Sequence, residues 1–235
     1  MSIRVQNISK KYGKHFALDK ISFQTQSNSI IGFLGPNGAG KSTTMKLIAG
    51  ILPIESGECF IEDINVRLNA LEAKKIMGYL PEHNPLYLDM YVREILEYQA
   101  ALYKLNNISN RVRQVIEKTG LRSEQHKKIK ELSKGYRQRV GLACAIIHQP
   151  RVLLLDEPTT GLDPNQIIEI RQLIKELSKE STILLSTHLM QEVEAICDEI
   201  ILIHQGKIKD QFLLPEKHIH YADLSMEEIF VQLTR

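Results

Sequence analysis

A glycine-rich segment at residues 35–43 has residue types and a spacing that suit phosphate binding. It fits the pattern G-x-x-x-x-G-K-[S/T], follows the apolar run Ile30–Leu34 and precedes a helix-forming stretch, which is the context that this pattern requires. Its glycines let backbone N–H groups approach a polyphosphate, and the helix start attracts anions. Lys41 is expected to reach the β- and γ-phosphates, and the Ser42 hydroxyl to bind Mg²⁺. The sequence therefore predicts a nucleoside triphosphate site made by Gly35, Asn37, Gly38, Ala39, Gly40, Lys41, Ser42 and Thr43.

Two adjacent acids, Asp156 and Glu157, follow the apolar run Val152–Leu155. Ligands of parallel sheets bind at the carboxyl ends of the strands, so these side chains are expected beside the phosphates. Asp156 is predicted to hold Mg²⁺, and Glu157 to accept a proton from a water that attacks the γ-phosphate. His188 follows the run Ile183–Leu185, where its side chain is expected to reach the γ-phosphate. The predicted catalytic residues are Glu157, His188 and Lys41.

The elements that must position these residues are short apolar runs that alternate with helix-like stretches. Several runs are apolar throughout, which is typical of strands covered on both faces of a mostly parallel sheet. The strand–helix–strand order predicts an α/β fold. The predicted strands are Ile3–Val5, Ile21–Phe23, Ile30–Leu34, Met77–Leu80, Val152–Leu155, Ile183–Leu185 and Ile200–Ile203, and helices are predicted at Lys41–Ala49, Leu142–His148 and Pro164–Lys179.

The middle of the chain differs, because residues 84–130 show a helical pattern without a convincing strand. Val92–Lys104 and Asn110–Thr119 are the predicted helices there. We therefore expect one domain, 1–235, with an α/β core of residues 1–82 and 135–235 and an inserted helical subdomain of residues 83–134. Near the end of the chain, Ser225–Thr234 is predicted as an amphipathic helix, with Ser225 as its N-cap and Glu228 at the third helical position.

Composition and charge exclude several classes of function. The 235 residues carry a formal net charge of +2, which is too small to indicate nucleic-acid binding. The longest apolar run, Leu142–Ile147, is far shorter than the about 20 residues of a membrane-spanning helix, and the polar start of the chain has no signal-peptide core. Cys59, Cys144 and Cys197 are spaced as free thiols of a reducing compartment. We expect a soluble, cytoplasmic protein.

A further motif lies upstream of the acid pair, in residues 131–140, Glu-Leu-Ser-Lys-Gly-Tyr-Arg-Gln-Arg-Val. It resembles the signature motif of ATP-binding-cassette (ABC) proteins, which normally reads Leu-Ser-Gly-Gly-Gln. Tyr12 matches the family's aromatic residue that stacks on adenine, and Asp163, in the segment 160–164, matches the loop that contacts the opposite subunit. Glu82 falls where the family has a glutamine that touches Mg²⁺ and the membrane partner. The matching motifs cover essentially the whole chain in the family's order.

The resemblance implies a P-loop NTPase core of the RecA type, with an N-terminal antiparallel β portion and an inserted helical subdomain, that binds ATP and Mg²⁺. It also implies a head-to-tail homodimer or pseudo-symmetric pair, in which Ser133 and Gly135 of one subunit face the γ-phosphate held by Lys41 of the other. Independently, Ser133 can cap a helix that begins near Gly135, and such a helix start attracts anions. Lys134, Tyr136 and Glu82 depart from the family pattern.

The function implied by the resemblance is that of an ATPase subunit powering a membrane transporter. Such a subunit is peripheral on the cytoplasmic face of the membrane and is joined to a separate transmembrane permease. The stretch Pro85–Tyr91 is placed either for contact with that permease or for ordinary packing of the subdomain. The signature and Glu82 look like the subgroup that serves type-2 exporters, and residues 81–87 look like the ATPase subunit associated with gliding motility.

An alternative function is an ATP-driven clamp on nucleic acid or ribosomes, built on the same cassette. A basic cluster could attract phosphate backbones or form an ordinary solvated surface. A single cassette without a long coiled coil favours the transporter subunit, so no nucleic-acid partner is expected. A small-molecule kinase is a third class, but the sequence contains no evident acceptor-binding lid. The residues of the basic cluster are Lys127, Lys128, Lys130, Lys134, Arg137 and Arg139.

Overall fold

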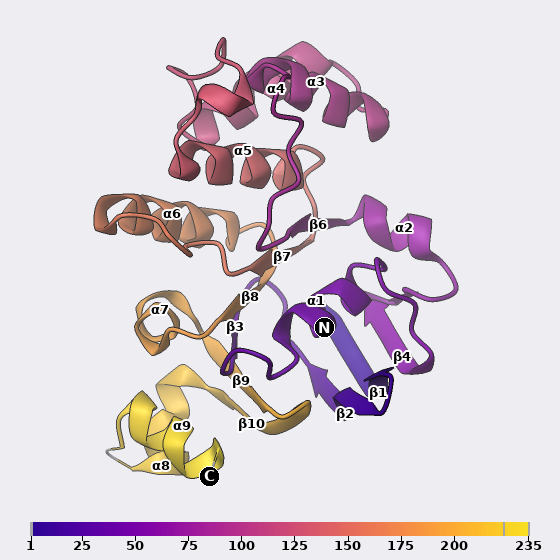
Figure 1. Cartoon of the computed structure of the whole chain (residues 1–235), viewed down its shortest axis with the longest axis vertical. Helices are drawn as coiled ribbons and strands as arrows, with labels where there is room; N and C mark the ends of the chain where they lie inside the picture. The colour runs from indigo at the N-terminus through magenta and orange to yellow at the C-terminus, as the bar shows by residue number, and fades with distance from the viewer. Residues whose placement is uncertain (1, 223, 235) are drawn as a thin grey trace.

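The computed structural model describes residues 2–222 and 224–234, and its central element is a six-stranded sheet (Figure 1). The strand order is β10-β9-β3-β8-β7-β6, with β10 antiparallel at one edge and the other strands parallel. This arrangement confirms the expected α/β fold with a mostly parallel sheet. The strands are β3 (Ile30–Leu34), β6 (Met77–Leu80), β7 (Val152–Asp156), β8 (Thr182–Thr187), β9 (Glu199–His204) and β10 (Lys207–Leu213).

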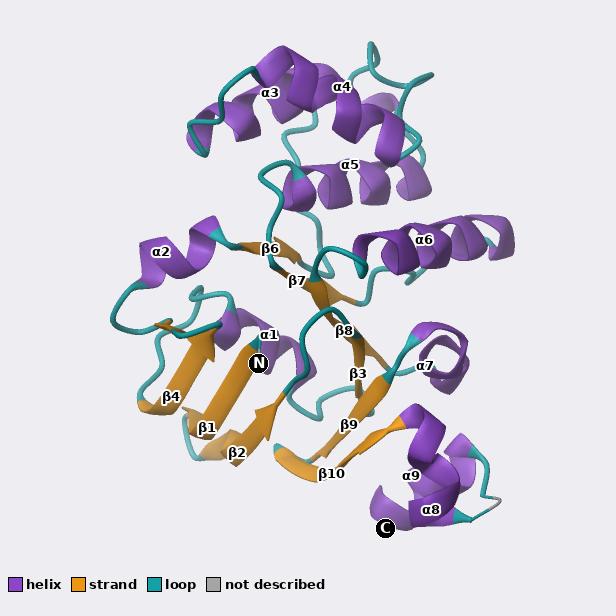
Figure 2. Cartoon of the chain, turned by 180° about the vertical axis from the view of Figure 1, so that it is seen from behind, coloured by secondary structure: helices purple, strands orange, loops and turns teal. Residues whose placement is uncertain are grey.

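A second, antiparallel sheet has the order β2-β1-β4-β5 and meets the first sheet where β2 lies beside β10 (Figure 2). It confirms the antiparallel N-terminal portion that the resemblance implies. Its first two strands extend well beyond the expected apolar runs, because most of their exposed positions are polar. The sequence patterns do not predict β4, β5 or β10. The strands of this sheet are β1 (Ile3–Tyr12), β2 (His15–Gln24), β4 (Ser56–Ile61) and β5 (Ile64–Asn65).

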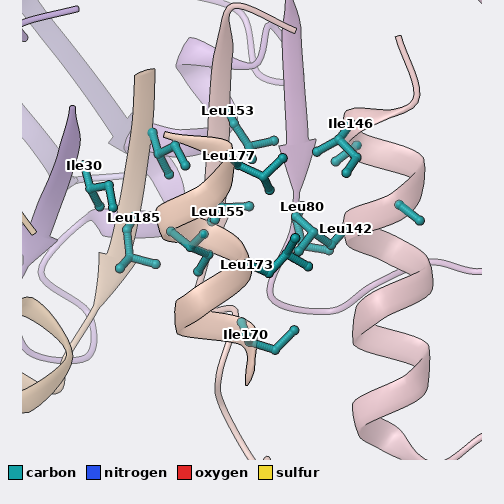
Figure 3. Packing of buried hydrophobic residues seen from close by; sticks show 14 of the residues in the cluster. Ile30, Leu80, Leu142, Ile146, Leu153, Leu155, Ile170, Leu173, Leu177 and Leu185 are labelled. Atoms are coloured by element: carbon teal, nitrogen blue, oxygen red, sulfur yellow. The ribbon is translucent and has the colours of Figure 1, made fainter. Parts of the chain in front are cut away.

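Apolar side chains of the parallel strands alternate between two cores, one on each face of the six-stranded sheet. In β3, Ile30 and Leu34 join one core, and Ile31 and Phe33 join the other. Figure 3 shows the first core, where leucine and isoleucine side chains of the strands pack against α5 and α6. The second core lies between the sheet, α1 and the antiparallel sheet. The helices are α1 (Lys41–Ile48), α2 (Ala70–Lys75), α5 (Lys134–Ile146), α6 (Pro164–Leu177) and α7 (Met190–Ile196).

Helices α3 (Val92–Leu102) and α4 (Ile108–Lys118) form a layer at one end of the molecule, at the top of Figure 1. They lie within a few residues of the helices predicted there, and the 3₁₀ helix η1 (Ile129–Glu131) follows them. α5 contacts both these helices and strand β6, so it lies between the helical layer and the sheet. The predicted start of this helix at Leu142 is wrong, because its first turns are polar and only its second half forms an apolar run.

The C-terminal segment folds into the 3₁₀ helix η2 (Leu214–Glu216) and helices α8 (Lys217–Tyr221) and α9 (Met226–Thr234). Ser225 and Glu228 cap α9 reciprocally: the Ser225 N–H donates to Glu228 Oε2 at 2.8 Å, and the Glu228 N–H donates to Ser225 Oγ at 3.2 Å. This confirms the predicted N-cap. Among the described residues, no helix has the length and apolar character needed to cross a membrane.

Candidate active site

The loop after β3 leads directly into α1 and leaves the start of that helix open to an anion. Gly40, before the first helical residue, has a left-handed φ of 109°, which glycine adopts without strain. A Cβ on Gly35 would overlap the carbonyl oxygen of Ile203 in β9, so the loop passes too close to the sheet for a side chain there. The first turn of α1 has neither a side-chain cap nor an acidic residue. Its free N–H groups therefore fit a phosphate.

The side chain of Lys41, the first residue of α1, reaches back to this loop and is only 6% exposed. Its Nζ donates hydrogen bonds to the carbonyl oxygens of Gly35 at 2.8 Å and Pro36 at 3.3 Å. The same atom lies 3.5 Å from Glu157 Oε1. The structure therefore places a buried positive charge at the centre of the segment that the sequence predicts to hold phosphate.

Asp156 ends β7 and is 1% exposed. Its Oδ1 accepts hydrogen bonds from Ser42 Oγ at 3.2 Å and from Ser186 Oγ. Burial raises the pKa of this carboxyl, the two serine hydroxyls lower it, and the charges of Glu82 and Glu157 raise it further. Carboxylate and hydroxyl oxygens are ligands that Mg²⁺ prefers, so Asp156 and Ser42 fit this cation. Ser186 is a partner that the sequence patterns do not single out.

Glu157 follows Asp156 at a sharp turn of the backbone, with a left-handed φ of 51°. Such a conformation is costly for a residue other than glycine and is characteristic of functional sites. Its Oε1 and Oε2 lie 3.0 and 2.9 Å from His188 Nδ1, and Oε2 accepts a hydrogen bond from Thr160 Oγ1 at 3.1 Å. The carboxylate is therefore held between an imidazole, a hydroxyl and the ammonium of Lys41.

These side chains open into a cavity of about 510 Å³ at the ends of β3 and β7. Tyr12 borders it from the tip of the β1–β2 hairpin, with 52% of the residue exposed. Two lining residues, His15 and Ala17, carry no prediction from the sequence. Thr160, which belongs to the segment 160–164 predicted to contact the opposite subunit, also lines this cavity. His15 pairs with Tyr12 across the hairpin. The short spacing of these two residues in the sequence is the signal that could have predicted His15 at the cavity. The predicted residues that line the cavity are Tyr12, Asn37, Gly38, Gly40, Lys41, Ser42, Thr43, Glu82, Glu157 and His188.

Ser133, Gly135 and Asp163 do not line this cavity. Ser133 is exposed and caps α5 by accepting from the Tyr136 N–H at 3.4 Å. Asp163 is exposed and caps α6 by accepting from the Gln166 N–H at 3.0 Å. Gly135 and Asp163 border a separate cleft of about 620 Å³ between α5 and α6. The structure therefore divides most of the predicted site residues between two regions of the surface, whereas Gly35, Ala39 and Asp156 are buried and line neither.

Two of the residues that depart from the family pattern have defined surroundings. The Glu82 side chain is 43% exposed at the edge of the 510 Å³ cavity. Lys134 extends its Nζ over Gly161, where a Cβ would overlap the ammonium group. The signature segment and the loop before α6 are thus in contact within one chain.

Most of the basic cluster is engaged within the chain. Arg137 donates hydrogen bonds to two backbone carbonyl groups, those of Ile129 at 3.2 Å and Lys130 at 2.8 Å. Other members form ion pairs, so much of the positive charge that could attract nucleic acid is neutralised locally. These pairs are Lys127–Glu124, Lys130–Asp89 and Arg139–Glu169.

The three cysteines carry free thiols, as their spacing predicts. Burial raises the pKa of Cys59 and Cys144 to about 12 and raises that of Cys197 as well. A nucleophilic cysteine needs a lowered pKa, so these thiols do not form a second candidate active site.

Comparison with known proteins places this geometry among ATP-binding cassettes. The family model described as "ABC transporter" matches residues 18–160. The chain is 36% identical to the bacitracin transport ATP-binding protein BcrA of Bacillus licheniformis over 219 residues, which cover 92% of this chain and 71% of that protein. A solved structure of an ATP binding subunit of an ABC transporter is similar, with a TM-score of 0.90, 28% identity and coverage of 100% of both chains.

A second solved structure shares the fold at lower identity. It is a dimeric post-hydrolysis state of an ATP-binding cassette bound to ADP and Pi. Its TM-score is 0.82 at 24% identity, with 90% of this chain and 98% of that chain covered.

Proposed function

This chain belongs to the ABC transporter family, and on that premise we propose that the cavity at the ends of β3 and β7 is its ATP site. The chain is an ATP-binding and ATP-hydrolysing subunit that powers a membrane transporter. One observation carries the assignment of the site: the Glu157 carboxylate lies 3.5 Å from Lys41 Nζ and 2.9 Å from His188 Nδ1, directly beside the open start of α1.

Each of these residues has a separate part in the proposed reaction. Glu157 accepts a proton from the water that attacks the γ-phosphate. Lys41 neutralises charge on the transferring phosphoryl group, and His188 orients the Glu157 carboxylate and contacts the γ-phosphate. The free N–H groups at the start of α1 hold the phosphates, and Tyr12 stacks on the adenine.

Mg²⁺ neutralises negative charge on the β- and γ-phosphate oxygens when it is bound. We propose that Ser42, Asp156 and Glu82 hold it. Ser42 Oγ and Asp156 Oδ1 lie 3.2 Å apart. Glu82 lines the ATP cavity, as Ser42 does. The hydrogen bond from Ser186 fixes the Asp156 carboxylate in this orientation.

The separation of the site residues into two surface regions supports a head-to-tail pair of subunits. Ser133 lies exposed at the start of α5, and Asp163 lies exposed at the start of α6. We propose that Ser133, Gly135 and Asp163 of one subunit contact the ATP held by the other, in a homodimer or a pseudo-symmetric pair. The similar cassette that was solved as a dimer supports this proposal. Two-fold symmetry would make both ATP sites equivalent.

Replacing the proposed base tests the mechanism. Glu157→Gln keeps the size of the side chain but removes the proton acceptor. We predict that it binds ATP, accumulates as a dimer and hydrolyses ATP at least about 10²-fold more slowly. Phosphate release and size-exclusion chromatography in the presence of ATP measure both effects. The control is Glu180→Gln, since the Glu180 side chain is 74% exposed and lies outside the cavity. Normal turnover and normal dimer dissociation of Glu157→Gln would contradict the assignment.

A second cavity, of about 480 Å³, supports the contact with a transmembrane permease. It lies between α1, β6 and α3 and is lined by tyrosines and by residues of the 81–87 segment. Tyr87 and Tyr98 border it with 60% and 44% of each residue exposed, and their rings meet edge to face. We propose that a cytoplasmic segment of the permease binds there and holds this subunit on the cytoplasmic face of the membrane.

A charge placed in this cavity tests the permease contact. We predict that Tyr87→Asp reduces recovery of the chain with the membrane fraction by about tenfold, as expected for the loss of an aromatic interface anchor. The ATPase activity of the isolated protein should be retained. Leu71→Asp is the matched control, because Leu71 is 77% exposed on α2 and does not line the cavity. Equal membrane recovery of both variants would contradict the proposal.

The finer assignment is to the subgroup of type-2 exporters. The similarity to the bacitracin transport protein BcrA supports an exporter, as do the signature segment and Glu82. The resemblance of residues 81–87 to the subunit associated with gliding motility remains a prediction. Co-purification in mild detergent would identify the permease, and its identity would separate an exporter of small molecules from a motility complex.

A further inference from the structure

Glu192 is a buried carboxyl group that lies outside the residues lining the ATP cavity. It belongs to the first turn of α7 and is 1% exposed. Both of its oxygens are occupied: Thr159 Oγ1 donates to Oε1, and Thr187 Oγ1 donates to Oε2 at 2.5 Å. A buried carboxyl is costly unless it is hydrogen-bonded, and here two hydroxyl groups fix its orientation.

The two threonines belong to the loops that carry the proposed catalytic residues. Thr159 follows Glu157 by two positions, in the loop after β7. Thr187 ends β8 and directly precedes His188. The Thr187 hydroxyl also accepts a hydrogen bond from the Leu189 N–H at 3.1 Å, which fixes the backbone on the other side of His188. Glu192 therefore joins two loops that are also linked by the Glu157 N–H donating to Ser186 O at 3.1 Å and by the contact of His188 Nδ1 with the Glu157 carboxylate.

We infer that Glu192 is a positioning residue that sets the geometry between the Glu157 carboxylate and the His188 imidazole. This inference rests on the proposed ATPase function of the site. The distances of 2.9 and 3.0 Å between these groups depend on how the two loops are held. The loop after β7 continues to Asp163, which we propose to contact the second subunit. A shift of that loop on dimer closure thus reaches His188 through Thr159, Glu192 and Thr187.

A purely structural role for Glu192 predicts different behaviour. If Glu192 served only to hold α7 in place, its replacement would lower the melting temperature, and any loss of activity would be independent of His188. If it acts through His188, its replacement should change kcat more than KM and should have no further effect once the imidazole is absent. Double-mutant cycles separate these cases.

The first experiment compares Glu192→Leu, Glu192→Gln and Glu194→Leu by steady-state ATPase kinetics. Glu194 is the matched control, because it is exposed on the same helix. We expect Glu192→Leu to lower kcat by about 10- to 10²-fold, as for a small misplacement of reacting groups, with KM changed by less than about threefold. Glu192→Gln retains a carbonyl acceptor and should restore most of the activity, whereas Glu194→Leu should match the wild type.

The second experiment places Glu192→Leu in the His188→Ala background. We expect no further loss of kcat; a loss as large as in the wild-type background would overturn the inference. If Glu192→Leu does not fold, Thr159→Val and Thr187→Val remove single hydroxyl groups at nearly constant volume, and the same cycle is run with each. An inactive wild type would contradict the proposed ATPase function itself. An active wild type with unaffected Glu192 and threonine variants would contradict only the positioning role.

Discussion

Glu82 is a carboxylate at the edge of the ATP cavity, in a position where the family pattern has glutamine. Its charge raises the pKa of Asp156, because two carboxylates repel each other unless a cation lies between them. We predict that Glu82→Gln binds ATP more tightly than the wild type in EDTA and reaches half-maximal ATPase activity at a higher Mg²⁺ concentration. Nucleotide binding without metal and Mg²⁺ titrations measure these effects. Identical behaviour of the two proteins in both assays would contradict the proposed role.

His148 is a second residue whose surroundings give a testable pH effect. Its ring stacks on Tyr103 with centroids 3.8 Å apart, and Nε2 lies 3.1 Å from the Met77 carbonyl oxygen. Nδ1 is buried and has no hydrogen-bond partner among the residues that the structure describes. The pKa of His148 is lowered from 6.5 to about 4, chiefly by burial; the hydrogen bond with the Met77 carbonyl opposes this shift, and the charge of Arg111 adds to it. The unfolded chain therefore binds a proton at a higher pH than the folded one.

This difference predicts that the free energy of unfolding falls as the pH drops through the window between 6.5 and about 4. Above that window His148 is neutral in both states and has no effect. Because the residue is partly exposed, we expect a loss of at most about 2 kcal/mol. Urea midpoints at pH 7 and 5 measure it. His148→Phe, which keeps a ring against Tyr103, should reduce the pH dependence, whereas His218→Gln, at an exposed position, should leave it unchanged.

At the scale of single residues, the sequence was sufficient to predict the positions of residues at the ends of parallel strands. Lys41, Asp156 and Glu157 follow apolar runs, and the carboxyl ends of such runs meet at one edge of a sheet. Glu192 could not be predicted, because its role depends on two threonines from separate loops. A glutamate in a short helix otherwise has the pattern of a solvent-exposed residue.

The reciprocal cap of α9 gives a prediction at the scale of single elements. Ser225→Ala removes the side-chain acceptor for the Glu228 N–H and should destabilise this helix by about 1 kcal/mol. Hydrogen exchange of the α9 amides should become faster, while exchange in α6 should be unchanged. Ser225→Asn retains an acceptor at the N-cap and should protect α9 as the wild type does. Equal protection of α9 in the alanine variant would contradict the importance of the cap.

The elements themselves were predictable where one physical signal dominated. β3 and β6 have the predicted bounds, because both are short apolar runs covered on their two faces. The start of α5 was not predictable from apolar residues, since its first half is polar, although Ser133 correctly indicates the N-cap. β10 was not predicted, because its lysines and aspartate interrupt the apolar pattern of a strand. Such charged residues are common on edge strands.

At the scale of the whole molecule, the ATP cavity combines residues from two sheets. Tyr12 and His15 belong to the antiparallel sheet, whereas Lys41 follows β3 of the other. Gln211 of β10 joins the sheets, because its Nε2 donates at 2.5 Å to both the Gln24 carbonyl oxygen and Glu199 Oε1. The adenine and phosphate portions of the proposed site are therefore aligned by contact between the sheets.

The sequence patterns could not predict how the motifs are arranged on the whole molecule. Periodicity predicted a helical segment inside an α/β core, but it could not show that α5 contacts both parts. The division at residues 83–134 remains a prediction. Only the family resemblance predicted that Ser133 and Lys41 of one chain belong to different ATP sites. The order of motifs along the chain does not show which cavity each side chain borders. The second surface region lies at the starts of α5 and α6, where Ser133 and Asp163 are exposed.

The order of strands in the six-stranded sheet has a consequence for biosynthesis. β3, which precedes the phosphate-binding loop, lies between β8 and β9 and pairs with both, and these strands begin at Thr182 and Glu199. A ribosome that has completed β3 must therefore translate past Thr182 before either neighbouring strand exists. Non-local pairing of this kind is slow and leaves partly made chains open to aggregation. Nascent chains of this protein should thus acquire the ability to retain ATP only after β8 and β9 have been translated.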